Sequence, residues 1–304
     1  MLMLWILLGI AAAASWSFAA FIDNYLTDVI FRDKMPQAVK LASGPVYILI
    51  SIIVFLATGA IMPEAWQAGL LILSGFISAI GTLAYYQALK NEEATGAAIF
   101  YQLQPIMFLA IDFFLFNESI TFKQIIGFLV VLSAPIIVIF SRKHKKSRKL
   151  ELTAALLLVL YVFIATISAE ISTRTSVGMN FITVICFYLF GRGITDYLFN
   201  LMPSYRKRHK YAIKKYGLRY RFMVAFDILL CSAADFAYRY SLIIGIAALS
   251  SAITNAAELI LTFLFGIILS IIWPKFGREK LHRHLIIAHV IAVILCVVGI
   301  IIIQ

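Results

Sequence analysis

Long apolar stretches alternate with short polar segments along the whole 304-residue chain. One helical crossing of the hydrocarbon core of a bilayer takes about 20 mostly apolar residues. Stretches of this kind occupy residues 2–22, 41–61, 66–89, 94–116, 121–140, 150–170, 178–202, 222–244, 247–273 and 284–303. The pattern therefore predicts an all-α polytopic membrane protein with ten transmembrane helices.

The composition excludes a soluble domain beside these spans. Hydrophobic residues make up 62% of the chain and charged residues 13%, against about 25% charged residues in an average soluble domain. Ala11–Ala14 resembles a cleavage region, but no Lys or Arg precedes it, so we expect a retained first helix rather than a signal peptide. Cys186, Cys231 and Cys296 fall inside spans without CxxC spacing, which argues against a disulfide framework.

The positive charges gather in the loops at one side of the predicted bundle. Of the 26 Lys and Arg residues, 22 lie in the loops that follow odd-numbered spans, and Lys40 is counted among them. Because positive loops stay in the cytoplasm, we predict a cell membrane protein, inner or plasma membrane, with both termini outside. Contacts with anionic lipids are the second expected role of these runs, and we expect no nucleic-acid partner.

Residues 203–221 form the longest basic segment and carry four interleaved tyrosines. Alternating cations and aromatic side chains suit a helix that lies in the headgroup layer. A solvated loop is an equally good interpretation of the same composition.

A weak internal repeat relates the two halves of the chain at an offset of 153 residues. The segment from Tyr85 to Leu89 matches that from Tyr238 to Leu242, Gln102 falls on Asn255, and Pro105 falls on Glu258. A repeat of five helices must cross the bilayer in opposite senses, which is a common plan of secondary transporters. We therefore predict two inverted five-helix repeats, at residues 1–149 and 150–304.

These residues resemble the drug/metabolite transporter superfamily, in particular its EamA-type ten-helix members. The resemblance rests on Trp16-Ser17-Phe18, on Tyr85–Phe140 with its Tyr-x-x-Ala-Leu pattern and helix proline, and on the weaker copy in residues 237–303. It implies transport of small metabolites, such as amino acids or amphipathic and cationic compounds. Glu258 replaces the second-half proline, and the charge count reverses the usual cytoplasmic placement of the termini.

Ionisable residues inside the spans are the strongest candidates for function, because a charge at mid-bilayer needs a partner or a water-filled cavity. Glu258 lies near the middle of its span without a cation nearby in sequence. Asp235 and Arg239 are four residues apart on one helix face, as are Arg192 and Asp196, so each couple is predicted to form an ion pair.

Polar and aromatic residues of the other spans complete the predicted substrate and ion pathway. Its full set is Trp16, Tyr85, Tyr86, Gln102, Gln104, Asp235, Arg239, Asn255 and Glu258. Asp23, Asp112 and Asp227 are expected nearer the interfaces and in contact with water. The sequence carries no recognisable enzyme or metal-binding motif, so we expect neither catalysis nor a cofactor.

The favoured function is a secondary transporter that moves a small-molecule substrate through a central cavity by alternating access. Glu258 makes proton coupling the leading energy source. A non-transporting scaffold that holds a partner through residues 203–221, a lipid-linked-sugar translocase, and a homodimer all remain open. A polar cavity that reaches Glu258 would favour transport, a packed midplane the scaffold, and a lateral opening to lipid the translocase.

Overall fold

The computed structural model describes residues 2–31, 36–90, 92, 94–116, 121–141, 148–273 and 283–303. Within these ranges the regular structure is entirely helical and contains no strand. The α-helices are α1 Leu2–Tyr25, α2 Lys40–Thr58, α3 Ala65–Ala88, α4 Ala94–Tyr101, α5 Gln104–Phe116, α6 Phe122–Ser141, α7 Arg148–Thr175, α8 Phe181–Leu198, α9 Pro203–Ile244, α10 Ala247–Ile272 and α11 Arg283–Ile303. A π-helical turn, Leu26–Ile30, prolongs α1, and short 3₁₀ turns precede α2 and α9.

Seven helical segments of the described chain are long and apolar enough to cross a membrane. They are Met3–Ile30, Gln37–Thr58, Ala65–Ala88, Gly96–Phe116, Leu152–Thr175, Phe181–Leu201 and Ala247–Ile272. The protein is therefore an all-helical, multi-pass membrane protein.

The predicted span 94–116 is broken between α4 and α5. The amide nitrogens of Gln102 and Leu103 bond to carbonyl oxygens three residues back, at 3.3 and 3.0 Å, instead of four. Pro105, two residues after Leu103, has no amide hydrogen to continue the α-helical pattern. The break therefore has an identifiable cause in the sequence.

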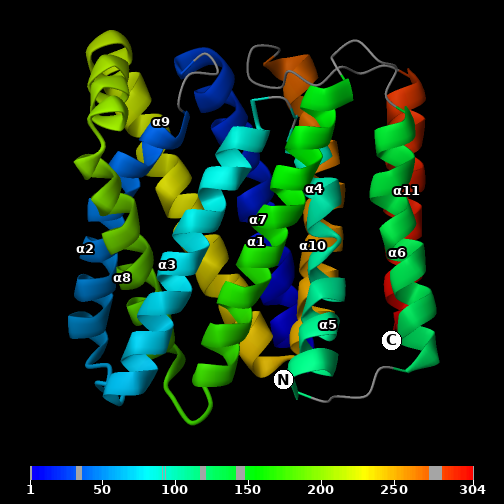
Figure 1. The fold of residues 1–304 in the computed structure, drawn as a ribbon, viewed down its shortest axis with the longest axis horizontal. Helices are drawn as coiled ribbons and strands as arrows, with labels where there is room; N and C mark the ends of the chain where they lie inside the picture. The colour runs from blue at the N-terminus through cyan, green and yellow to red at the C-terminus, as the bar shows by residue number, and fades with distance from the viewer. Residues whose placement is uncertain are drawn as a thin grey trace.

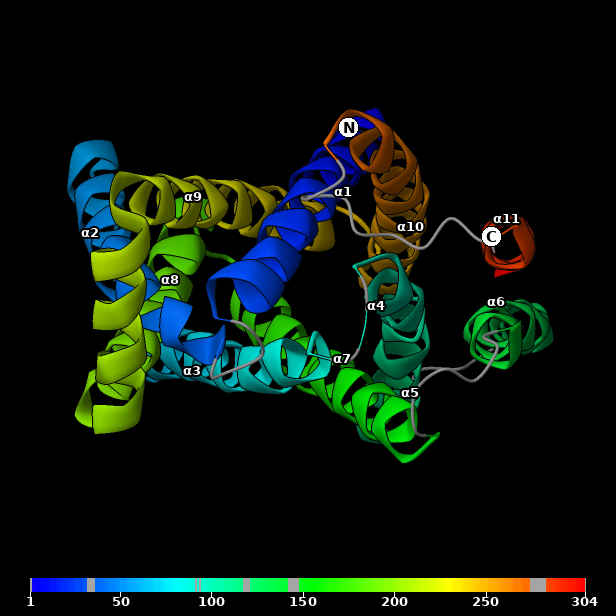
Figure 2. The same ribbon diagram turned by 90° about the horizontal axis from the view of Figure 1, so that it is seen from above.

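The helices run up and down across the molecule, and the two termini lie at the same end (Figure 1). Seen from above, α1 to α5 and α7 to α10 form one group of helices, whereas α6 and α11 pack on each other at one side (Figure 2). The site described below lies inside the larger group of helices.

Residues 203–216 are helical, as the first of the two alternatives for this segment requires. Gly217 has a φ of 54°, in the left-handed region that favours glycine, and it separates this stretch from the rest of α9. The stretch runs across the end of the bundle (Figure 2). Tyr216 donates a hydrogen bond to the carbonyl oxygen of Val29 at 3.1 Å, and His209 lies 2.9 Å from the Tyr220 hydroxyl.

The first and second parts of the chain pack backbone against backbone where α3 meets α8. A Cβ atom at Gly75 would overlap the carbonyl oxygen of Tyr188, and one at Gly191 would overlap the carbonyl oxygen of Ile72. Glycines let helix backbones approach without side chains between them. This contact places Tyr188 and Arg192 of α8 opposite the inner face of α3.

Candidate functional site

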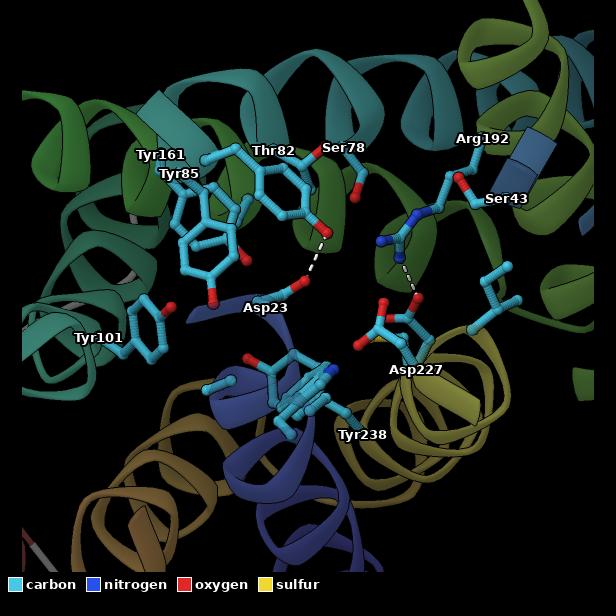
Figure 3. A pocket seen from close by; sticks show the side chains of 18 of the residues that line it. Asp23, Ser43, Ser78, Thr82, Tyr85, Tyr101, Tyr161, Arg192, Asp227 and Tyr238 are labelled. Atoms are coloured by element: carbon cyan, nitrogen blue, oxygen red, sulfur yellow. Dashed lines mark hydrogen bonds and ion pairs between the residues drawn. The ribbon is translucent and has the colours of Figure 1, made fainter. Parts of the chain in front are cut away.

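A polar cavity of about 120 Å³ lies between α1–α5 and α7–α10. Its lining is Trp16, Ala19, Ala20, Asp23, Val39, Lys40, Ser43, Tyr47, Ser78, Thr82, Tyr85, Tyr86, Tyr101, Gln104, Tyr161, Val162, Ala165, Ala169, Tyr188, Arg192, Asp227, Ile228, Cys231, Asp235, Tyr238, Arg239, Asn255 and Glu258. In Figure 3, Tyr85, Tyr101 and Tyr161 gather at one side, and Arg192 and Asp227 at the other. The cavity thus has an aromatic side and a charged side.

The main ion pair of the charged side joins two helices. Arg192 of α8 donates a hydrogen bond to the Asp235 carboxylate of α9, and its guanidinium also lies 4.9 Å from the centre of the Tyr47 ring. The predicted pairing of Asp235 with Arg239 within α9 is therefore wrong. Helix packing brings Arg192 to the carboxylate, a relation that residue spacing within one helix does not reveal.

Lys40 forms a second buried pair across helices. Its ammonium lies 3.7 Å from Asp196, which also accepts a hydrogen bond from Ser43 at 2.8 Å. The predicted pair between Arg192 and Asp196 is therefore wrong, because each residue has another ion-pair partner. Lys40 is also no loop cation: it is the first residue of α2 and is only 4% exposed.

Arg239, the third cation of the cavity, is held differently. It donates hydrogen bonds to the hydroxyls of Ser172 and Ser168 on α7, and its guanidinium lies 3.4 Å from the centre of the Tyr188 ring. Among the described residues, no carboxylate forms an ion pair with it.

Two carboxylates that we expected near the interfaces are buried at the cavity. Asp23 and Asp227 are each 5% exposed. Tyr86 donates a hydrogen bond to Asp23 at 2.6 Å, while the Cys231 thiol lies 3.9 Å from the Asp227 carboxylate. Asp23 was misplaced because its helix continues beyond the apolar stretch as far as Ile30, which moves the carboxylate away from the helix end.

Two aromatic contacts join the first part of the chain to the second. Tyr85 of α3 lies 5.3 Å from Tyr161 of α7, and Tyr238 of α9 lies 5.0 Å from Trp16 of α1, measured between ring centroids. Offset or edge-on pairs at these separations are favourable. All four rings line the cavity.

Glu258 lies on α10, is 4% exposed and lines the cavity. Its backbone oxygen accepts a hydrogen bond from Ser17 at 3.1 Å, and no described residue forms a hydrogen bond with its carboxyl group. The carboxyl group is therefore available to a proton or a ligand.

Gln102 and Asn255, which the repeat places at equivalent positions, contact each other. Gln102 donates to the backbone oxygen of Asn255 at 2.7 Å, and Asn255 donates to the backbone oxygen of Tyr101 at 2.8 Å. Gln102 itself does not line the cavity, whereas the other eight residues of the predicted pathway do. Lys40, Arg192, Asp23 and Asp227 are lining residues that our pathway prediction omitted.

No group of metal-ligating side chains is found among the described residues. The arrangement instead offers cations, carboxylates and aromatic rings around one small cavity. Such a site can bind a polar solute through charge and ring contacts.

The sequence and the fold each resemble those of known proteins. The sequence model of a family described as "EamA-like transporter family" matches residues 3–140. A solved structure titled only "Crystal structure of protein" superimposes with a TM-score of 0.66, at 17% identity, over 98% of this chain and 95% of that chain. This structural similarity shows a shared fold alone. No curated protein matches the sequence significantly.

Proposed function

We propose that the chain, whose residues 3–140 match the model of the EamA-like transporter family, is a secondary transporter that moves a small metabolite by alternating access. The observation that carries the proposal is the polar cavity, which lies within the helices and reaches Glu258. Buried ionisable groups in a membrane protein commonly mark a substrate or ion path.

The two rival functions are less well supported. A scaffold needs no polar space at its centre, whereas this cavity is lined by seven charged side chains. A lipid-linked-sugar translocase would need a polar route that opens sideways to lipid. The hollow between α5 and α7 is lined mainly by apolar side chains and shares no lining residue with the cavity.

For the architecture, we propose ten spans in two inverted halves, residues 1–149 and 150–304. In addition to the seven segments above, α6, α11 and the part of α9 after Gly217 would cross the membrane. The packing supports this division: α2 contacts α8 and α6 contacts α11, and α1 contacts α9 as α3 contacts α7. In this division α2 and α8 are the second spans of the two halves, and α6 and α11 are the fifth spans. The contact between α1 and α9 joins a first span to a third span, and the contact between α7 and α3 does the same with the halves exchanged.

Glu258 is the proposed proton-coupling group. A carboxyl group that alternating access exposes to each side in turn can carry a proton with or against the substrate. Glu258→Gln keeps the size of the side chain but cannot change charge. We expect this variant to fold, to bind substrate, and to lose pH-driven flux in proteoliposomes while it retains exchange.

The matched control is Glu64→Gln, at an exposed carboxylate that caps α3 outside the cavity. It should retain pH-driven flux. If Glu258→Gln also retains full pH-driven flux, Glu258 does not couple transport to protons. If the wild-type protein moves no metabolite, the transporter proposal itself fails.

The orientation of the protein is a further proposal. Residues 203–221, which are rich in Lys and Arg, lie at the end of the bundle opposite the two termini (Figure 1). We place this end in the cytoplasm next to anionic lipids. A cysteine at exposed Ser204 should then be protected from impermeant thiol reagents in intact cells, and one at exposed Val177 should be labelled. The reverse pattern would invert the topology.

A further inference from the structure

The three cations of the cavity differ in how their charge is balanced. Lys40 has Asp196 as its counter-ion, and Arg192 has Asp235. Arg239 is as deeply buried as these two, at 5% exposed, yet only the neutral hydroxyls of Ser168 and Ser172 bond to it. The positive charge of Arg239 is therefore the one without a counter-ion among the described lining residues.

The two serine hydroxyls satisfy only some of the hydrogen-bond donors of the Arg239 guanidinium. Arginine carries five N–H donors, and the bonds to Ser172 and Ser168 use one each on its two terminal nitrogens. Its Nε–H has no hydrogen-bond partner among the described residues. A buried charge without an opposite charge is unfavourable, so such a residue is usually retained for a ligand or for a second conformational state.

The position of Arg239 favours a ligand. Its side chain lines the cavity, and the Tyr188 ring holds its guanidinium from one face. Asp235 already forms an ion pair with Arg192. The other lining carboxylates are those of Asp23, Asp227 and Glu258, and none of them forms an ion pair with Arg239. An incoming oxyanion would thus meet a cation that no carboxylate of the described chain already neutralises.

We propose that Arg239 forms an anion subsite of the cavity, which binds the carboxylate or phosphate group of a small solute. The planar guanidinium suits such groups because it can donate two parallel hydrogen bonds to their oxygens. The aromatic rings of Trp16 and Tyr238 lie on the same lining and provide apolar contact for the rest of the solute. The inference rests on the proposed function, in that the cavity is taken as the substrate site.

The test measures binding to the purified full-length protein by thermal shift and by isothermal titration calorimetry. The probes are benzoate, benzylammonium and benzyl alcohol, which share a ring and differ in charge, together with inorganic phosphate. We expect saturable binding of benzoate in preference to the other two aromatic probes. Stronger binding of phosphate than of benzoate would assign the subsite to phosphate groups.

Arg239→Gln should weaken anion binding at least tenfold and should leave the unliganded protein no less stable, because an uncompensated charge is removed. Arg239→Lys keeps the charge without the two-pronged geometry and should bind with intermediate affinity. Arg219→Gln is the control: Arg219 is an exposed cation over the Tyr25 ring, outside the cavity, and its loss should leave binding unchanged.

Preference for benzylammonium, absence of anion binding, or unchanged benzoate affinity in Arg239→Gln would overturn the subsite. The selectivity of the wild-type protein among the three aromatic probes tests the subsite even if a variant fails to fold. Anion binding that depends on Arg239 without flux in proteoliposomes would support the subsite and refute the transporter proposal. Flux without such binding would refute the subsite alone.

Discussion

The two parts of the chain, residues 2–141 and 148–303, contribute equally to the wall of the cavity but unequally to its charge. Each provides fourteen lining residues. The first part gives two charged side chains, Asp23 and Lys40, and the second gives five: Arg192, Asp227, Asp235, Arg239 and Glu258. The same helix packing can therefore be kept in both parts while most of the charged groups are concentrated in one.

The family match covers only one of these two parts. The matched residues, 3–140, form the part with the fewer charges. The expectation of a transporter therefore rests on that part. The ion pairs and Glu258, which would set the specificity and the coupling, lie almost entirely outside it.

The largest expected effect comes from breaking the buried pair of the second part. Asp235→Asn leaves Arg192 without its counter-ion and should lower the free energy of unfolding by about 3–5 kcal/mol. Asp23→Asn, in the first part, keeps an acceptor for the Tyr86 hydroxyl and should cost about 1 kcal/mol or less. Denaturant titration in detergent measures both.

Two double variants identify the partner of Asp235. Replacing Arg192 and Asp235 together by apolar residues should restore much of the lost stability. Replacing Arg239 and Asp235 together should not, because Arg192 would remain uncompensated. The opposite ranking would show that Asp235 pairs with Arg239 after all.

A smaller effect is expected where the two parts touch. Gly75→Ala places a methyl group against the backbone of α8 and should destabilise the protein by about 1–3 kcal/mol. Gly69 lies on the same helix with open space at its Cβ position, so Gly69→Ala should be neutral or slightly stabilising. Equal melting temperatures for the two variants would mean that α3 and α8 are not in close contact.

The smallest effect concerns the helix of residues 203–216. Burial lowers the pKa of His209, so the unfolded state binds the proton more readily than the folded state. Stability should therefore fall as the pH drops below about 6.5, the ordinary pKa of histidine. His209→Gln should remove this component of the pH dependence, and an unchanged melting profile between pH 5 and 7.5 would exclude it.

The seven apolar spans and eight of the cavity-lining residues could be predicted because both leave a local signal in the sequence. A run of about 20 apolar residues is visible in the sequence itself. The ion pairs were mispredicted because the sequence shows only which charged residues lie four apart on the same helix, not which residues meet across helices. Arg192 of α8 and Asp235 of α9 are 43 residues apart, and only the packing of the folded bundle brings them together. Lys40 was missed because its helix begins one residue before the apolar stretch.

Access to the cavity from both sides of the membrane tests the central claim most directly. Cys231 lines the cavity and can serve as its reporter once Cys186 and Cys296 are replaced by serine. A small impermeant methanethiosulfonate reagent is added to one side, and then to the other, of oriented proteoliposomes. Alternating access predicts that Cys231 reacts from either side, whereas reaction from one side only, or from neither, would contradict the account.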